Sequence, residues 1–422
     1  MARFSCSRVA LLAATLLIAC FVAACGGGGG GSGGASSVSN TSSPSSTSNS
    51  SPATVLAANV AAITVDRGVS GVPNMPFVSV TVCTPGGSSC QTIDHVLVDT
   101  GSWGLRVFAS QLPASLALPQ QTNASGVPLA ECMQFFDGYT WGSVRLADVQ
   151  IAGEHAASLP IQVIDQNYAA VPTSCANTGA ARNTPSTLAA NGILGIGVFK
   201  HDCGAACANQ AISGAYYACT GASCAPTAVA QARQVANPVP YFGADGNGVV
   251  VSLPAVPSGS AASVTGALIF GIGTQSNNAL GGSTQVIGVD PLRGVFTTTE
   301  NGTTYSASII DSGSTGLFFA TNQLPVCASP NQSYYCPNST EQLNATNQGT
   351  NGVTSAVTFS VGNAAQIWQS SGGASAMPLF AGPAFVGSQV FDWGLPFFYG
   401  RTVYAAIEQQ STPAGAGPYF AY

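Results

Sequence analysis

The chain contains His95-Val96-Leu97-Val98-Asp99-Thr100-Gly101-Ser102-Trp103-Gly104-Leu105, an apolar run that delivers one carboxylate into a tight polar turn and then resumes. About half a chain later the same order returns as Ser308-Ile309-Ile310-Asp311-Ser312-Gly313-Ser314-Thr315-Gly316-Leu317. Of the eleven Asp residues, only Asp99 and Asp311 are followed by Ser or Thr and then Gly. The two copies indicate an internal duplication in which two strands each end in an acid and the two acids come together.

Each turn has the composition of a carboxylate cradle. Gly101 and Gly313 allow close backbone approach or a positive φ, and neighbouring hydroxyls can donate hydrogen bonds to carboxylate oxygens. These hydroxyls belong to Thr100, Ser102, Ser312 and Ser314. In a chain rich in Gly, Ser and Thr, the alternative is that both turns are ordinary, as in an unrelated β-rich adhesion or glycan-binding protein.

With these loops the sequence resembles the pepsin-like aspartic peptidases, in which each of two lobes supplies one Asp loop. Further landmarks follow in the family's order over most of residues 58–422: they are Pro76–Val82, Asn191–Gly197, Gly266–Gly273 and the closing segment Trp393–Ile407. The closing segment departs from the family pattern, because Trp-Gly-Leu-Pro replaces the usual Leu-Gly-Asp. The resemblance implies an all-β, bilobal pepsin-like fold with few short helices. The lobes would be residues 58–258 and 259–422, with an active-site cleft between them.

The resemblance also implies an aspartic endopeptidase. Asp99 and Asp311 would share one proton and activate a water molecule, because two carboxylates at close range do not both ionise readily. Thr100 and Ser312 match the residues that lock the two loops together, and Ser102 and Ser314 match those that bond the outer carboxylate oxygens. The substrate would be a peptide or protein held in extended form, and neither metal nor cofactor is implied. A catalytically idle peptide-binding or envelope scaffold of the same fold is the alternative.

A flap is expected from Phe135 to Val144, where Asp137-Gly138 is a hairpin turn signal. Family members usually carry a Tyr-Gly pair near the start of this hairpin. Tyr139 has the hydroxyl, whereas Phe136 lies nearer the family's position, so both are flap candidates. An exposed aromatic hairpin without a role in catalysis is the alternative.

The N-terminus has the order of an export signal, with Arg3 and Arg8 before the apolar run Val9–Ala24. The tetrapeptide ending in Cys25 resembles the bacterial lipobox, which predicts a signal peptide over residues 1–25 and lipidation of Cys25. Residues 26–57, rich in Gly, Ser and Thr, are predicted to form a disordered tether. We expect a monomer anchored in the bacterial cell envelope, at the outer membrane because no Asp follows Cys25.

Composition narrows the possible partners. Only 6% of residues are charged, Lys200 is the single Lys and the net charge is −6, which argues against nucleic acid as a ligand. Ten cysteines follow Cys25, an even number that in an exported chain predicts disulfides. The plausible local pairs are Cys83 with Cys90, Cys219 with Cys224 and Cys327 with Cys336. A zinc site at His201, Cys203, Cys207, Cys219 and Cys224 is the weaker alternative.

Short apolar or alternating segments separated by Gly, Pro, Asn and Ser predict strands. They are Phe77–Cys83, Ile93–Asp99, Ser143–Ile151, Gly248–Leu253, Ala267–Phe270, Tyr305–Asp311, Val353–Val361 and Thr402–Ile407. The best helical signal runs from Ala225 to Val235 and stops at Asn237-Pro238.

Overall fold

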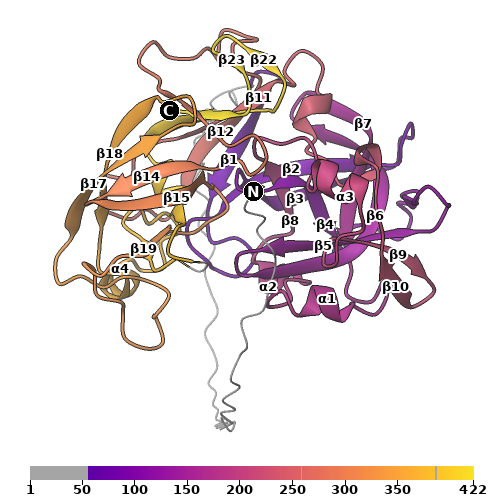
Figure 1. Ribbon diagram of the computed structural model, residues 1–422, viewed down its shortest axis with the longest axis horizontal. Helices are drawn as coiled ribbons and strands as arrows, with labels where there is room; N and C mark the ends of the chain where they lie inside the picture. The colour runs from indigo at the N-terminus through magenta and orange to yellow at the C-terminus, as the bar shows by residue number, and fades with distance from the viewer. Residues whose placement is uncertain (1–55, 258, 385–386) are drawn as a thin grey trace, which may run out of the picture. The chain divides into compact units, whose positions relative to one another are not determined.

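The protein is predominantly β, with few and short helices (Figure 1). The computed structural model describes residues 56–257, 259–384 and 387–422. The expected signal peptide, the lipidation site Cys25 and nearly all of the expected tether therefore lie outside the described residues. Among the described residues, no helix is both long enough and apolar enough to cross a membrane.

Two sheets contain most of the described strands. The larger sheet has the order β10-β9-β5-β6-β7-β4-β8-β3-β2-β1-β12-β11-β21-β24-β13, and the smaller has the order β18-β17-β14-β15-β20-β16-β19. The larger sheet comprises β1 (Val60–Val65), β2 (Pro76–Cys83), β3 (Cys90–Asp99), β4 (Trp103–Phe108), β5 (Leu129–Phe135), β6 (Gly138–Ile151), β7 (Glu154–Ile164), β8 (Gly192–Ile196), β9 (Tyr216–Thr220), β10 (Ser223–Pro226), β11 (Gly248–Leu253), β12 (Val264–Phe270), β13 (Val286–Gly288), β21 (Arg401–Ala406) and β24 (Tyr419–Ala421). The smaller comprises β14 (Phe296–Glu300), β15 (Thr303–Ile310), β16 (Leu317–Phe319), β17 (Glu341–Gln348), β18 (Thr354–Val361), β19 (Ala381–Gly382) and β20 (Phe391–Trp393).

The remaining described elements are short. A small hairpin is formed by β22 (Ser411–Thr412) and β23 (Gly415–Ala416). The α-helices are α1 (Thr173–Ala176), α2 (Pro185–Leu188), α3 (Gly204–Asn209) and α4 (Ala364–Ser370). The 3₁₀ turns are η1 (Ala109–Gln111), η2 (Gln231–Arg233), η3 (Val239–Tyr241) and η4 (Leu395–Phe397).

The strand pairing repeats around the two Asp turns. In the first half, β8 lies parallel to β3 and antiparallel to β4, which in turn lies parallel to β7. In the second half, β20 lies parallel to β15 and antiparallel to β16, which lies parallel to β19. The internal duplication that the Asp motifs predict is therefore visible in the strand topology.

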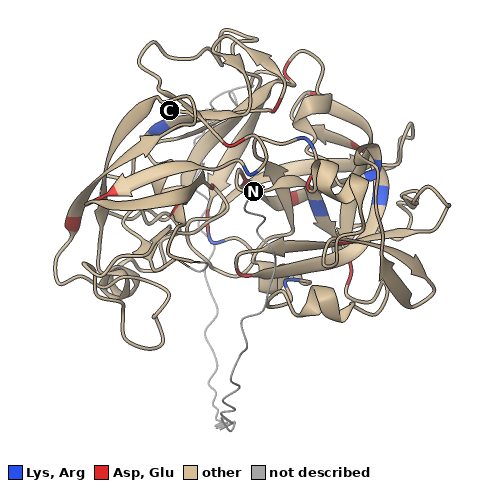
Figure 2. Cartoon of the chain, in the orientation of Figure 1, with Lys and Arg blue, Asp and Glu red and all other residues tan. Residues whose placement is uncertain are grey.

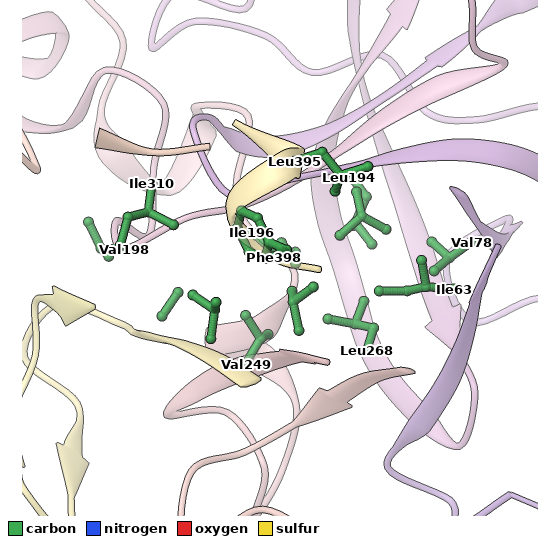
Figure 3. Close-up of a cluster of buried hydrophobic side chains, with 14 of the residues drawn as sticks. Ile63, Val78, Leu194, Ile196, Val198, Val249, Leu268, Ile310, Leu395 and Phe398 are labelled. Atoms are coloured by element: carbon green, nitrogen blue, oxygen red, sulfur yellow. The ribbon is translucent and has the colours of Figure 1, made fainter. Parts of the chain in front are cut away.

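A continuous apolar core, part of which is drawn in Figure 3, includes Val98 and Ile310, the residues that precede the two Asp. It combines side chains from both halves of the chain, among them Val78, Leu194, Leu268 and Ile310, each at most 3% exposed. Close packing also explains a glycine in β8, since a Cβ on Gly195 would lie 2.7 Å from the Trp103 backbone nitrogen. Charged residues are few along the described chain (Figure 2).

Disulfides form as the cysteine pattern predicts. The local pairs Cys83–Cys90, Cys219–Cys224 and Cys327–Cys336 are confirmed. The pairs that the sequence did not specify are Cys132–Cys175 and Cys203–Cys207. The four cysteines of the zinc alternative are thus bonded to one another and present no thiolate.

Each predicted strand coincides with an observed one to within a few residues, but the helix predicted from Ala225 to Val235 is wrong. The Cys219–Cys224 disulfide closes a hairpin that places Ser223–Pro226 in β10. Farther on, the Val229 N–H donates to the Cys207 carbonyl, and only η2 is helical. Tertiary hydrogen bonds have replaced the local helical ones. The division at residues 258 and 259 stays a prediction, and residues 55–422 cluster as one unit.

Candidate active site

Two strand ends bring Asp99 and Asp311 together. Asp99 is the last residue of β3, and Asp311 directly follows β15. A Cβ on Gly101 would lie 2.5 Å from the Asp311 Cγ atom, and a Cβ on Gly313 would lie 2.8 Å from the Asp99 Oδ1 atom. Both glycines therefore serve close approach, and neither of them has a positive φ.

The two carboxylates have the same local hydrogen bonds. Asp99 Oδ1 accepts from the Gly101 N–H at 2.8 Å, and its Oδ2 accepts from the Ser102 hydroxyl. In the second turn, Asp311 Oδ1 accepts from the Gly313 N–H at 2.8 Å. Its Oδ2 accepts from the Ser314 hydroxyl at 3.0 Å. Gly101, Ser102, Gly313 and Ser314 thus each donate a hydrogen bond to the carboxylate of their own loop.

Thr100 and Ser312 lock the two turns together by reciprocal hydrogen bonds. The Thr100 hydroxyl donates to the Ile310 carbonyl at 2.8 Å and accepts from the Ser312 N–H at 2.9 Å. The Ser312 hydroxyl donates to the Val98 carbonyl at 2.7 Å and accepts from the Thr100 N–H at 3.1 Å. Because both side chains are buried, these bonds fix the separation of the turns.

The environment disfavours charge on Asp311. Asp99 and Asp311 are only 6% and 9% exposed. Burial raises the pKa of the Asp311 carboxyl well above its usual value, and the neighbouring Asp99 and Asp392 raise it further. The two carboxyls lie against each other's turns, an arrangement that suits a pair of carboxyls sharing a proton.

A third carboxyl, Asp392 on β20, was missed by the sequence analysis. It is 1% exposed, its Oδ2 accepts from the Ser314 hydroxyl at 2.6 Å, and its Oδ1 has no partner. Burial raises the pKa of Asp392 to about 8, the Ser314 hydrogen bond opposes this rise, and the charge of Asp99 adds to it. The available signal was an acid between Phe391 and Trp393, two large apolar residues.

The carboxyls lie in a cleft of about 520 Å³ that both Asp99 and Asp311 line. Most of the remaining wall is apolar. It includes Val72, Met75, Leu97, Phe135, Ile193, Phe318 and Tyr334. A second cavity of about 320 Å³ begins at Thr100 and Gly101 and is lined by Trp103, Val295, Ile309 and Phe420, among others.

A hairpin reaches both cavities. Its strands are β5 and β6, and Phe136-Asp137 forms the turn, one residue before the predicted Asp137-Gly138. Gly138 is instead needed for packing, because a Cβ there would lie 2.3 Å from the Ala180 carbonyl oxygen. Phe136 is 47% exposed and lines both cavities. Tyr139 is 6% exposed and packs in a separate apolar cluster around Trp141, so the structure does not bring it to the cleft lining.

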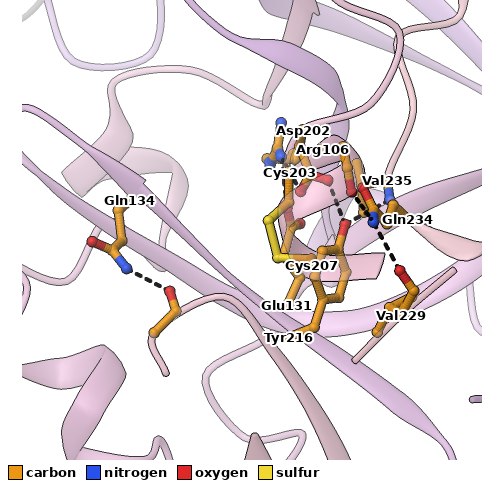
Figure 4. The surroundings of a disulfide bond; sticks show 12 residues. Arg106, Glu131, Gln134, Asp202, Cys203, Cys207, Tyr216, Val229, Gln234 and Val235 are labelled. Carbon is orange, nitrogen blue, oxygen red and sulfur yellow. Dashed lines mark hydrogen bonds and ion pairs between the residues drawn. A yellow bond between two sulfur atoms is a disulfide. The ribbon is translucent and has the colours of Figure 1, made fainter. Parts of the chain in front are cut away.

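A buried ion cluster of Arg106, Glu131 and Asp202 includes one residue of this hairpin, Glu131 (Figure 4). The Arg106 guanidinium on β4 bonds Glu131 on β5 at 2.6 Å and Asp202 at 3.3 Å. It also donates to the Trp103 carbonyl at 2.8 Å, just beyond the Asp99 turn. Burial raises the pKa of Asp202 well above its usual value, and the charge of Glu131 raises it further. Arg106 therefore ties the first Asp turn to the hairpin.

Among the described residues, no group of three or more His, Cys, Asp or Glu side chains is arranged to hold a metal ion. The chemistry that the site can support is acid–base chemistry between carboxyls. It resides in Asp99 and Asp311, with Asp392 behind Ser314.

One known protein family matches almost the same residues that the structure describes. A search of curated proteins finds no match. The sequence model of one family, described as "Protein of unknown function (DUF3443)", matches residues 55–422. Since this match covers most of its length, the chain belongs to the DUF3443 family.

Proposed function

We propose that the chain is an aspartic endopeptidase with a pepsin-like active site. One observation carries the proposal: reciprocal hydrogen bonds between Thr100 and Ser312 hold two buried Asp turns at the base of one cleft. Ordinary turns in an adhesion protein need no such mutual lock. The geometry of functional groups, rather than the β-rich fold alone, is the argument for catalysis.

We further propose a bilobal pepsin-like fold with lobes at residues 58–258 and 259–422. The repeated pairing of three strands and an Asp turn supports it, because the arrangement of β3, β4 and β8 recurs in β15, β16 and β20. The site would then lie where the two repeats meet.

In the proposed reaction one proton is shared by the dyad. The raised pKa of Asp311 favours the proton there, which leaves Asp99 to take a proton from an attacking water. The neutral Asp311 donates a hydrogen bond to the scissile carbonyl, and the water oxygen adds to its carbon. Asp99 then delivers its proton to the leaving nitrogen as the C–N bond breaks and the carbonyl re-forms, so Asp99 is ionised again and Asp311 still holds its proton.

The cleft suits an extended peptide with apolar side chains. Apolar residues line the cavity on either side of the dyad, and Phe136 on the hairpin contacts both cavities. Apolar area removed from water would supply the binding free energy, at about 25 cal/mol per Å². We propose cleavage between apolar residues.

One observation favours an idle peptide-binding scaffold as the second candidate. The Ser314 hydroxyl faces two carboxyls, Asp311 and Asp392, whereas the Ser102 hydroxyl bonds Asp99. If Ser314 donated only to Asp392, Asp311 would lose a donor to its ionised form.

We propose the cell envelope as the location, with a lipid anchor at Cys25 and the monomeric 58–422 region on the non-cytoplasmic side. The lipobox-like sequence and the disulfides support export. The proposed outer-membrane site follows from the residues after Cys25.

The test is cleavage of a mixed peptide library by residues 55–422 from acidic to neutral pH. Asp99→Asn and Asp311→Asn should each abolish cleavage, whereas the matched control Asp94→Asn should not, because Asp94 is exposed on the same strand. Cleavage that survives both active-site substitutions refutes the proposal. A folded protein that binds peptides without cleaving them at any pH supports the scaffold.

A further inference from the structure

Asp392 breaks the symmetry of the two repeats. In the second repeat it pairs with Ile309 on β15 and with Phe318 on β16. The corresponding residues of the first repeat are Leu97 on β3 and Arg106 on β4, and both pair with Ile193. Ile193 therefore takes the place of Asp392 in the first repeat. The position that holds an apolar side chain in the first repeat therefore holds a buried acid in the second.

A buried acid in place of isoleucine is costly unless it is neutral or hydrogen-bonded. Asp392 has one partner, the Ser314 hydroxyl, and that hydroxyl also contacts Asp311 Oδ2. A hydroxyl has one proton to donate. Ser314 can donate to only one of the two carboxyls, so the other is satisfied when it carries a proton and donates to the Ser314 oxygen.

Two hydrogen-bonded arrangements fulfil this condition. In one, Asp392 is protonated and donates to Ser314, which donates to the Asp311 carboxylate. In the other, Asp311 is protonated and donates to Ser314, which donates to the Asp392 carboxylate. They interconvert when the protonated carboxyl gives its proton to the Ser314 oxygen and the Ser314 hydroxyl gives its own proton to the other carboxylate. The net result is the transfer of one proton between the two carboxyls.

We propose that Asp392 is a positioning residue that acts through Ser314 to keep the shared proton on the Asp99/Asp311 dyad at higher pH than two carboxyls alone would allow. The effect on the pH dependence of catalysis rests on the proposed peptidase function. The coupling between the titrations of the three carboxyls does not, and it can be measured separately.

The surrounding groups leave the three carboxyls to act on one another. Of the elements packed against β20, β15 carries Tyr305, whose hydroxyl donates to the Ala320 carbonyl, and β16 carries no titratable residue. Burial raises the pKa of Tyr305 to about 12, so it stays neutral. No ion pair between described residues includes any of the three carboxyls.

The sign of the effect follows from the competition for the Ser314 hydroxyl. The dyad is active while it holds one proton, and the alkaline limb of the pH profile marks the loss of that proton. An ionised Asp392 accepts the hydrogen bond from the Ser314 hydroxyl, so an ionised Asp311 would lack that donor and the dyad loses its proton less readily. Asp392→Asn keeps the shape and a donor to Ser314 but removes the charge, so the alkaline limb should move to lower pH by about one unit.

The experiment uses the full chain labelled with ¹³C at the Asp carboxyl carbons, with wild type beside Asp392→Asn. Carboxyl titrations by NMR and kcat/KM against pH are recorded for both. Asp245→Asn is the matched control, since Asp245 is also buried and accepts from a Thr hydroxyl but faces Glu154 instead of the dyad. Asp392→Ile, which restores the residue of the first repeat, decides the question if Asp392→Asn does not fold.

The expected result is a downward shift of the dyad titration and of the alkaline limb in Asp392→Asn, with no shift in Asp245→Asn. The Asp392→Asn shift should shrink in a Ser314→Ala background, because the hydroxyl link is then absent. An unchanged dyad titration in Asp392→Asn overturns the inference, and so does an equal shift with and without Ser314. If no peptide is cleaved, the peptidase proposal fails, and the NMR titration still decides the coupling.

Discussion

Thr100→Val tests the lock between the two Asp turns with little change in side-chain shape. The substitution removes the oxygen that donates to the Ile310 carbonyl at 2.8 Å and accepts from the Ser312 N–H at 2.9 Å. Both backbone groups are left buried without a partner, and each such group costs about 1–3 kcal/mol. We therefore expect the free energy of unfolding to fall by about 2–6 kcal/mol.

The assay is equilibrium unfolding in urea, monitored by tryptophan fluorescence. Thr81→Val is the matched control, because the Thr81 hydroxyl contacts the Thr92 hydroxyl at 2.8 Å in an exposed position. That variant should stay within about 0.5 kcal/mol of wild type. In the peptidase assay, kcat/KM of Thr100→Val should fall at least about tenfold, since loosened turns no longer hold the dyad. A loss of stability no larger than that of Thr81→Val would refute the assignment of Thr100 and Ser312 as the lock.

Three further predictions concern other parts of the chain. Arg106→Met should lower the free energy of unfolding by about 3–5 kcal/mol in urea, because it leaves the buried Glu131 carboxylate unpaired; a loss under about 1 kcal/mol would contradict this. Burial, and then the neighbouring Asp245, raise the pKa of Glu154 from 4.5 to about 7. The folded protein therefore binds a proton at Glu154 more tightly than the unfolded chain does, and this contribution to stability is lost as pH rises from about 4.5 to 7. Glu154→Gln should flatten this decline in thermal melts at varied pH, and an unchanged slope would argue against the raised pKa. Phe136→Ala should raise KM several-fold with little change in Tm, because Phe136 lines both cavities but is 47% exposed; an unaltered KM would remove it from the binding site.

The site was predictable where local sequence repeats. Asp99 and Asp311 stand in matching apolar-Asp-hydroxyl-Gly patterns, and the strands that carry them are marked by alternating or continuous apolar residues. The hydroxyl partners lie within three residues of each Asp, so their contacts are nearly fixed by the turn itself.

What the sequence did not predict depends on contacts between distant segments. Asp392 joins the site only because β20 inserts between β15 and β16, and Ser314 meets it across 78 positions of sequence. Tyr139 and Phe136 are both aromatic residues of one hairpin, but only Tyr139 packs in the apolar cluster around Trp141. The helical pattern from Ala225 to Val235 was overridden by the hairpin that a disulfide closes.

The order of strands in the larger sheet has a consequence for biogenesis. β1 pairs with β12, while β11 pairs with β21 and β21 pairs with β24, so the larger sheet is completed only when residues 401–421 have been made. Pairing between strands so far apart in sequence folds slowly, because loop-closure entropy is lost before the contacts form. A chain that stopped before residue 401 would also leave one edge of β11 open to other chains. Folding must therefore wait for β21 and β24, and products truncated before residue 401 should aggregate rather than persist as half-molecules.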